Sequence, residues 1–498
     1  MKAHIERRHG LHAQSGQAMP FALIFLVVGA AALYLAFNAA QLAHAKTKEQ
    51  DTADAAAYSV GVLQARDLNF AAYTNRAMVA NQVATAQMIS IKSWIDELAG
   101  TYKNDHWFDS FIEDTAMVSE PWIGPKELGG PVTEGAKSAL DAATRIATAG
   151  LDGLDKVLST EQAAYHASMA LQIPVVAEEV AQANEPNSHV TKTYFATRGA
   201  LSIMSTLNFT KKNTPAGNTG TDRFADVVTN KTTLDGFVQQ RGANIRDPLV
   251  LSNIEECPGF SLIAADNNHL GGTQLRPDKR GWEGLDATDV NGAWICYFEI
   301  GAVGGPIISA AGSGGAANGP GGSYSGKNGY GGYRNYGGAL TSGLTEIAAR
   351  EQYSEGPGSS LSSTNGGLQP YLDLASQPTP SQGATFNRAP SITVEVQRVS
   401  STVNTTDQIH VATGDLAVSD ATAGHQMRSV ASASAYFIRP NEPSSGLAGA
   451  LNNASHWARS DGKWEYPSLF NPYWQSSLVT TDTAAVEAAD LAQSAGAP

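Results

Sequence analysis

The residues that come nearest to a metal-binding arrangement are Asp286, Asp289 and Asn291, which precede Gly292. Carboxylate and amide oxygens at alternating positions of a loop, followed by a glycine, are typical of calcium sites. Here the spacing differs from that pattern, and no glutamate follows where a bidentate ligand would be needed. Glu255, Glu256 and His410 could supply an acid and a base, but a chain of this size contains such residues by chance. We therefore predict no metal, no cofactor and no catalytic residue.

Motifs that would indicate a particular enzyme class are also missing from the sequence. There is no GxSxG nucleophile elbow, no phosphate-binding P-loop, no HExxH zinc motif and no GxGxxG that joins a strand to a helix. The 11 histidines are scattered and do not have the spacing of metal ligands. The sequence therefore predicts a protein that is not an enzyme.

The chain is long and poor in charge. It has 498 residues, of which 16% are charged, and its net charge is -14. With 42% hydrophobic residues it can build a substantial core, which excludes a wholly disordered polyelectrolyte. An acidic chain with few lysines and arginines does not fit phosphate backbones, so we expect no nucleic-acid partner.

The most distinctive segment is an uncharged stretch near the N-terminus. Residues 17–45 contain no Asp, Glu, Lys or Arg, and residues 18–37 are almost continuously apolar. Twenty such residues in a helix span about 30 Å, the thickness of the hydrocarbon core of a bilayer. The basic residues Lys2, Arg7 and Arg8 precede the segment, which predicts a cytoplasmic N-terminus and an exported remainder in a single-pass inner-membrane protein. The residues expected to anchor the chain in the membrane are Pro20, Phe21, Leu26, Leu33 and Phe37.

Three interpretations of this segment remain open. It is a retained anchor, or a pilin-like helix whose leader is removed between Gly16 and Gln17, or a secretory signal cut after Ala45. Pro20 fits each of them, because the first turn of a helix tolerates proline.

Helical sequence continues beyond the apolar segment. Residues 46–98 contain no proline and one glycine, and apolar residues recur at helical spacing, which predicts a long stalk that stops near Gly100. Amide side chains recur along it, and Asn75 and Gln82 are one heptad apart. These amides form either a solvated face or a contact with other helices, in which buried amides fix the register.

The rest of the chain predicts an α+β fold with helices first and an antiparallel sheet later. Further helices are expected over residues 133–184, interrupted at Pro174, and more weakly over 193–207 and 222–240. Strands are expected over residues 293–300, 391–399 and 429–438, the last rich in small residues that suit a sheet closely covered by another element. The predicted regions are a leader (1–16), a membrane helix (17–45), an exported helical region (46–246), a β-rich region (247–480) with a Gly-rich loop (301–343) and a Ser/Pro-rich loop (354–390), and a tail (481–498).

The N-terminal region resembles a known family. Residues 16–61 combine Gly16-Gln17, an apolar helix and the element QDTADAAA at residues 50–57, and in this order they resemble tight-adherence (Flp/Tad) pilus-assembly proteins of the TadE/TadG-like kind. The resemblance implies a membrane-anchored or pilin-like component of a pilus or related secretion assembly, with other subunits and the membrane as partners. It implies a helix contact at Asp54. Phe21 stands where processed pilins have glutamate, five residues into the mature chain, so cleavage is not carried over.

Two further features bear on the exported region. If it is oxidised, Cys257 and Cys296 could form one disulfide. Five aromatic residues lie within 18 positions near the C-terminus, which supports an alternative function as a membrane-anchored, adhesin-like module that binds a glycan or protein ligand at the surface. They are Trp457, Trp464, Tyr466, Tyr473 and Trp474.

Overall fold

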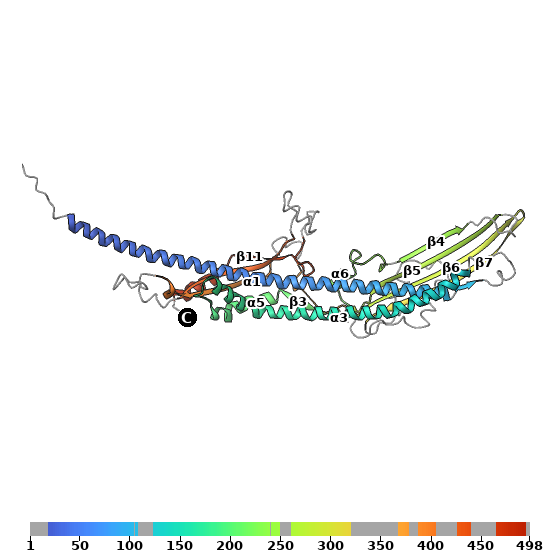
Figure 1. Cartoon of the computed structure of the whole chain (residues 1–498), viewed down its shortest axis with the longest axis horizontal. Coiled ribbons are helices and arrows are strands. Elements are labelled where there is room, and N and C mark those ends of the chain that lie inside the picture. Colours follow the sequence, from blue (N-terminus) through green and yellow to red (C-terminus); the bar gives the residue numbers. More distant parts are fainter. Residues whose placement is uncertain are drawn as a thin grey trace, which may run out of the picture.

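The protein is an elongated molecule built along one helix. The computed structural model describes residues 18–103, 105–107, 123–239, 241–249, 260–319, 367–377, 387–404, 426–439 and 465–494. Helix α1 (Ala18–Lys103) has 86 residues and is therefore about 130 Å long. Helix α3 (Ile123–Asn184) runs antiparallel beside its distal part (Figure 1). The predicted α+β class is confirmed, with a long N-terminal apolar helix and antiparallel sheets in the C-terminal region.

The two long helices follow from an alanine-rich sequence, but one expectation about them was wrong. Pro174 does not interrupt α3, which continues to Asn184 with Pro131 and Pro174 both inside it. Tertiary contacts on both sides of Pro174 hold the helix: Ile173 and Ala177 are fully buried in the core. Helix α1 passes Gly100 and ends at Lys103, three residues beyond the predicted stop.

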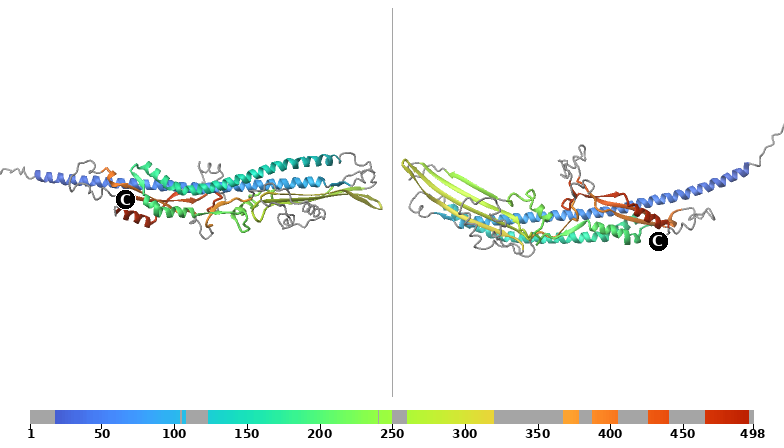
Figure 2. Two further views of the ribbon diagram at one scale, coloured as in Figure 1. Left: turned by 90° about the horizontal axis from the view of Figure 1, so that it is seen from below. Right: turned by 180° about the vertical axis from the view of Figure 1, so that it is seen from behind.

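An antiparallel sheet of long strands covers the distal end of α1. Its strands are β1 (Asp105–Trp107), β4 (Arg241–Leu249), β5 (Phe260–Leu275), β6 (Trp282–Phe298) and β7 (Gly301–Ala317), in the order β1-β7-β6-β5-β4. The sheet and the helical pair form two layers (Figure 2). Strand β4 crosses the predicted boundary between residues 246 and 247, so the sheet begins earlier than expected.

The Gly-rich stretch that was predicted as a loop begins instead with a strand. Residues 301–317 form β7, and its glycines let the strand lie directly on α1. A Cβ added at Gly314 would come within 2.1 Å of the Ser93 carbonyl oxygen and 2.2 Å of the Glu97 nitrogen. Only glycine fits this contact between strand and helix. Residues 320–343 of the predicted loop lie outside the described residues.

A second antiparallel sheet packs on α1 nearer its N-terminal end. It contains β2 (Ser188–Val190), β9 (Ile392–Val399), β10 (Gln426–Phe437) and β11 (Trp474–Val479), in the order β11-β10-β9-β2. The predictions of β9 and β10 are confirmed, and so is the close cover expected over the small residues of β10. At Gly61 of α1 an added Cβ would lie 2.9 Å from the Ala433 side chain.

Short elements complete the fold between the two sheets. Strands β3 (Thr210–Asn213) and β8 (Tyr371–Leu374) pair. The prediction of a Ser/Pro-rich loop over residues 354–390 was therefore wrong for the residues of β8. Helices α4 (Lys192–Tyr194), η1 (Phe195–Gly199) and α5 (Ala200–Leu207) cover the predicted helix 193–207. Helix α6 (Arg223–Val228) is shorter than expected, because turns follow it, and the predicted tail contains helix α10 (Thr483–Ser494).

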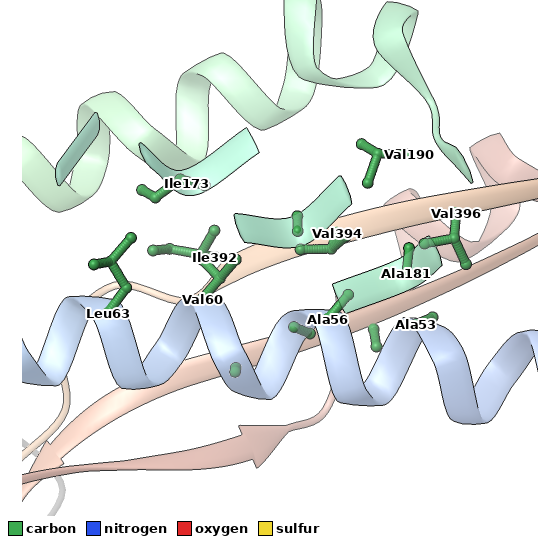
Figure 3. Close-up of a cluster of buried hydrophobic side chains, with 14 of the residues drawn as sticks. Ala53, Ala56, Val60, Leu63, Ile173, Ala181, Val190, Ile392, Val394 and Val396 are labelled. Atoms are coloured by element: carbon green, nitrogen blue, oxygen red, sulfur yellow. The ribbon is translucent and has the colours of Figure 1, made fainter. Parts of the chain in front are cut away.

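The buried hydrophobic residues form three separate clusters along α1 rather than a single core. The first joins Ala53 to Leu63 of α1 with α3, β2, β9 and β10 (Figure 3). The second and third lie further along α1, around Met78 to Ile89 and around Ala65 to Ala71. Helix α1 is therefore the element against which both sheets and α3 are built.

Candidate functional site

The apolar end of α1 is the most unusual surface of the molecule. Its large side chains are exposed, with Leu26 71% and Leu33 75% accessible, and an 18-residue apolar window of the helix has no buried residue. A core helix of a water-soluble protein would instead be covered. Among the residues that the structure describes, α1 is the one helix long and apolar enough to cross a membrane. The predicted anchor residues Pro20, Phe21 and Phe37 also lie on this stretch.

Burial of α1 begins at Asn38 and Ala45, where a charged group of side chains marks the base of the folded body. Glu185, at the end of α3, bonds Lys48 and lies 3.5 Å from Arg398 of β9. Glu49 accepts a hydrogen bond from Ser188, and burial raises its pKa. These contacts join the first buried turns of α1 to α3 and to the sheet of β2, β9, β10 and β11, called the proximal sheet below.

The amide side chains of α1 fasten it to strands of the same chain. Asn75 donates to the carbonyl oxygens of Leu372 (2.8 Å) and Leu469 (2.7 Å). Asn69 both donates to and accepts from the backbone of Trp474, at 2.9 and 3.0 Å. Asn75 is fully buried rather than solvated, and it also accepts a hydrogen bond from Gln162 of α3 (2.9 Å), a contact with another helix of the same chain. The backbone N–H and C=O groups at the edge of an extended segment need hydrogen-bond partners. A buried amide side chain can accept from the N–H and donate to the C=O at the same time.

Gln82 takes part in a similar network between α1 and α3. It donates to Asp155 Oδ2 (2.7 Å) and accepts from the indole nitrogen of Trp282 (3.1 Å). Asn81 donates to the other oxygen of Asp155 (2.7 Å). Burial raises the pKa of Asp155 to about 7, against the two amide bonds, which lower it. Gln82 is thus buried and makes a helix contact inside the chain, between α1 and α3; a contact with another subunit stays a prediction.

Asp54, the third predicted contact residue, is half-buried. It accepts a hydrogen bond from Gln50 Nε2 (3.0 Å), and the same nitrogen donates to the carbonyl oxygen of Val430 on β10 (3.1 Å). The carboxylate therefore orients Gln50 against the proximal sheet.

Asp67, His166 and Thr210 form an arrangement that sequence reasoning missed. His166 Nδ1 lies 2.7 Å from Asp67 Oδ2, and His166 Nε2 lies 3.0 Å from Thr210 Oγ1. A carboxylate, an imidazole and a hydroxyl in this order have the geometry of a nucleophilic triad. The three residues come from α1, α3 and β3, far apart in sequence and with no shared motif, so no signal in the sequence could have found them.

The surroundings of this triad favour a structural role. Thr210 is 8% exposed, which leaves no approach for the carbonyl carbon that a nucleophile must attack. Burial lowers the pKa of His166, but the bond and the charge of Asp67 outweigh it, so the pKa lies above its usual value. The raised pKa favours the protonated imidazole, and that form cannot take a proton from the hydroxyl. The triad is an ionic clamp that joins α1, α3 and β3.

The remaining predicted residues are placed as follows. Asp286 lies in β6, where it is buried and accepts a hydrogen bond from Ser93, whereas the side chains of Asp289 and Asn291 lie outside the described residues. Trp474 is 2% exposed and its indole donates to the Ser468 carbonyl oxygen (3.1 Å), so it belongs to the core. Gly16, Gln17, Glu255, Glu256, Cys257, His410, Trp457 and Trp464 lie outside the described residues, so the Cys257–Cys296 disulfide is not tested.

The described residues offer no group of three or more His, Cys, Asp or Glu side chains that could hold a metal ion. No family model matches the chain, and no curated protein and no solved structure is significantly similar to it. The arrangement that remains for a functional conclusion is an exposed apolar helix end joined without interruption to a rod-shaped body.

Proposed function

We propose that the protein is a membrane-anchored structural component of a tight-adherence type pilus or a related secretion assembly. The apolar end of α1 anchors it in the inner membrane, and the body is presented on the outer side. The observation that supports this best is the continuity of α1, in which one helix provides both the exposed apolar segment and the core of the body. The resemblance of residues 16–61 to pilus-assembly proteins supplies the kind of assembly.

Anchoring is tested by placing charge in the apolar segment. Leu26→Arg combined with Ala30→Arg is expected to release the chain from sedimented membranes, because each arginine at the centre of a bilayer costs about 3 kcal/mol. The matched control is Tyr58→Arg with Tyr73→Arg, since both tyrosines are exposed on the body. The control is expected to stay in the membrane fraction. If the wild-type chain itself is recovered without membranes, the proposal fails.

Orientation and role need separate measurements. Alkaline phosphatase fused after residue 498 is expected to be active, because it folds only outside the cytoplasm. Cells that lose the chain are expected to lose surface pili. Intact pili with lost adhesion would instead favour the alternative role as a membrane-anchored binding module.

A further inference from the structure

The outward face of α3 carries an uncovered apolar stripe along most of its length. Ile146 and Leu171 are 75% and 76% exposed, and Val132, Leu154, Val157 and Val175 are exposed as well. At 3.6 residues per turn these six side chains lie within a sector of about 100°. A Cβ added at Gly150 or Gly153, on the same side, would meet nothing within 4 Å.

This stripe follows the heptad spacing of a coiled coil. From Val132 to Pro174, steps of four and three residues alternate without a break through 13 positions, which take the letters a and d of a heptad. None of the 13 is charged; 11 are exposed and two are half-buried. A helix that packs only on its own body should bury such positions.

The opposite side of α3 is the side that faces the body. Position f of four successive heptads is buried, and its residues are Thr148, Asp155, Gln162 and Met169. Asp155 and Gln162 bond to α1, and Thr148 bonds within α3. The a and d side is open and uncharged, and its large side chains Val132, Ile146, Val157 and Leu171 stand among small residues. Over residues 148–162 the side of α3 that faces the body is therefore polar, whereas large apolar side chains stand on the open side, as expected of a helix that lies between the body and a partner.

The charged residues beside the stripe indicate which partner fits. Lys156 occupies position g and Glu161 occupies position e of the next heptad, and both are exposed. In a parallel, in-register pair of helices, g of one helix lies beside e of the next heptad of the other. Two copies of α3 would thus bring Lys156 of each copy to Glu161 of the other.

We propose that α3 of two copies of this chain pairs in parallel and in register through this face. The seam from Val132 to Pro174 is about 63 Å long, and with a helix about 10 Å wide it buries roughly 1,300 Å² in total, within the range of stable interfaces. Parallel pairing also places both apolar ends of α1 on the same side, as two anchors in one membrane require. The inference names a partner for the proposed assembly role and in that respect rests on it.

Cross-linking of the full chain in membranes tests the pairing directly. Ile146→Cys and Leu171→Cys are each expected to give a disulfide-linked dimer on oxidation, because identical residues face one another only in a parallel, in-register pair. Arg145→Cys is exposed but points away from the seam and is expected to give no more dimer than the wild-type chain, which supplies the background from its own cysteines. Dimers absent at both seam positions, or replaced by bands of another protein's mass, would overturn the inference.

Charge exchange tests the register without relying on oxidation. Lys156→Glu and Glu161→Lys are each expected to weaken dimerisation in mild detergent about tenfold, because like charges then meet in both symmetric pairs. The double exchange is expected to restore it. Val157→Lys in the seam is expected to abolish the dimer, whereas Glu134→Lys, exposed at position f, leaves it intact. A double exchange that is no better than the single variants contradicts the proposed register.

Membrane fractionation of each variant separates this inference from the proposed function. If the wild-type chain is anchored and dimeric but cells that lack it still form pili, the assembly role is refuted and the pairing stands. A chain that stays anchored and supports pili as a monomer would refute the pairing and keep the assembly role.

Discussion

The imidazole of His166 joins three elements that the chain brings together from distant segments. Both ring nitrogens are engaged, one with Asp67 on α1 and the other with Thr210 on β3. Because Asp67 is 3% exposed, its carboxylate depends on the imidazole for charge compensation. The clamp therefore makes stability depend on the protonation of one side chain.

Asp67→Asn tests this clamp. The raised pKa of His166 means that the folded chain binds the proton more tightly than the unfolded chain, so the stabilisation is complete below pH 6.5 and is lost as the pH rises through the folded pKa. At pH 6 the variant is expected to lose about 2 kcal/mol of unfolding free energy, the value of a charged hydrogen bond. Urea unfolding followed by circular dichroism should show this difference shrinking as the pH is raised through the folded pKa of His166. A difference that stays constant with pH, or an equal effect of Asp51→Asn at an exposed site, would contradict the clamp.

Asp155 depends on pH in the same direction as His166, but here the folded chain favours the neutral rather than the charged form of the side chain. Its pKa is raised from 3.8 to about 7, mainly by burial, so its contribution is complete below pH 3.8 and is lost as the pH rises through 7. Asp155→Asn cannot ionise and should unfold at higher urea concentration than the wild-type chain at pH 8, by at most about 4 kcal/mol. At pH 4 the two chains should differ little. A variant that is less stable at pH 8 would show that the ionised carboxylate is needed by Asn81 and Gln82.

At the scale of elements, close contact between glycine-bearing strands and α1 decides how the sheets are placed. The sequence predicted the helices and the alternating strand β9 well, because their periodicity is local. It failed for β7, since glycine was interpreted as a sign of a loop although here it removes side chains from a packed interface. For Asn75 and Gln82 the sequence indicated helix contacts but not their partners, because an amide on a helix does not specify which residue of α3 or of a strand it will bind.

Gly314→Ala tests the contact between β7 and α1. The added methyl group meets the backbone of Ser93 and Glu97, which cannot yield as a side chain could, so we expect a loss of about 1 to 3 kcal/mol. Gly301→Ala lies in the same strand, where an added Cβ meets nothing within 4 Å, and should be nearly neutral. Thermal unfolding of both variants gives the comparison. Equal midpoints would mean that the distal sheet does not rest on α1 at this residue.

In the whole molecule, α1 belongs both to the apolar segment and to the folded body, but the body does not depend on the apolar segment for its core. The first 20 described residues of α1 include no residue that is buried, whereas Asn38 and Ala45 already belong to the body. Helices in proteins gain most of their stability from tertiary packing, and in this segment only Ala31 and Tyr34 are half-buried while the other side chains are exposed. The body should therefore fold without it, while the segment needs a bilayer to be sheltered from water.

Removal of residues 1–37 tests this independence. The shortened chain is expected to be soluble without detergent and to keep its unfolding free energy within about 0.5 kcal/mol, since no buried side chain is lost. Removal of residues 1–57 also deletes Ala53, Ala56 and Ala57 from the first core cluster and should unfold the proximal sheet. Circular dichroism and sedimentation of the two chains give the measurement. If the shorter deletion aggregates or melts earlier than the full chain in detergent, the apolar segment is part of the fold rather than an anchor attached to it.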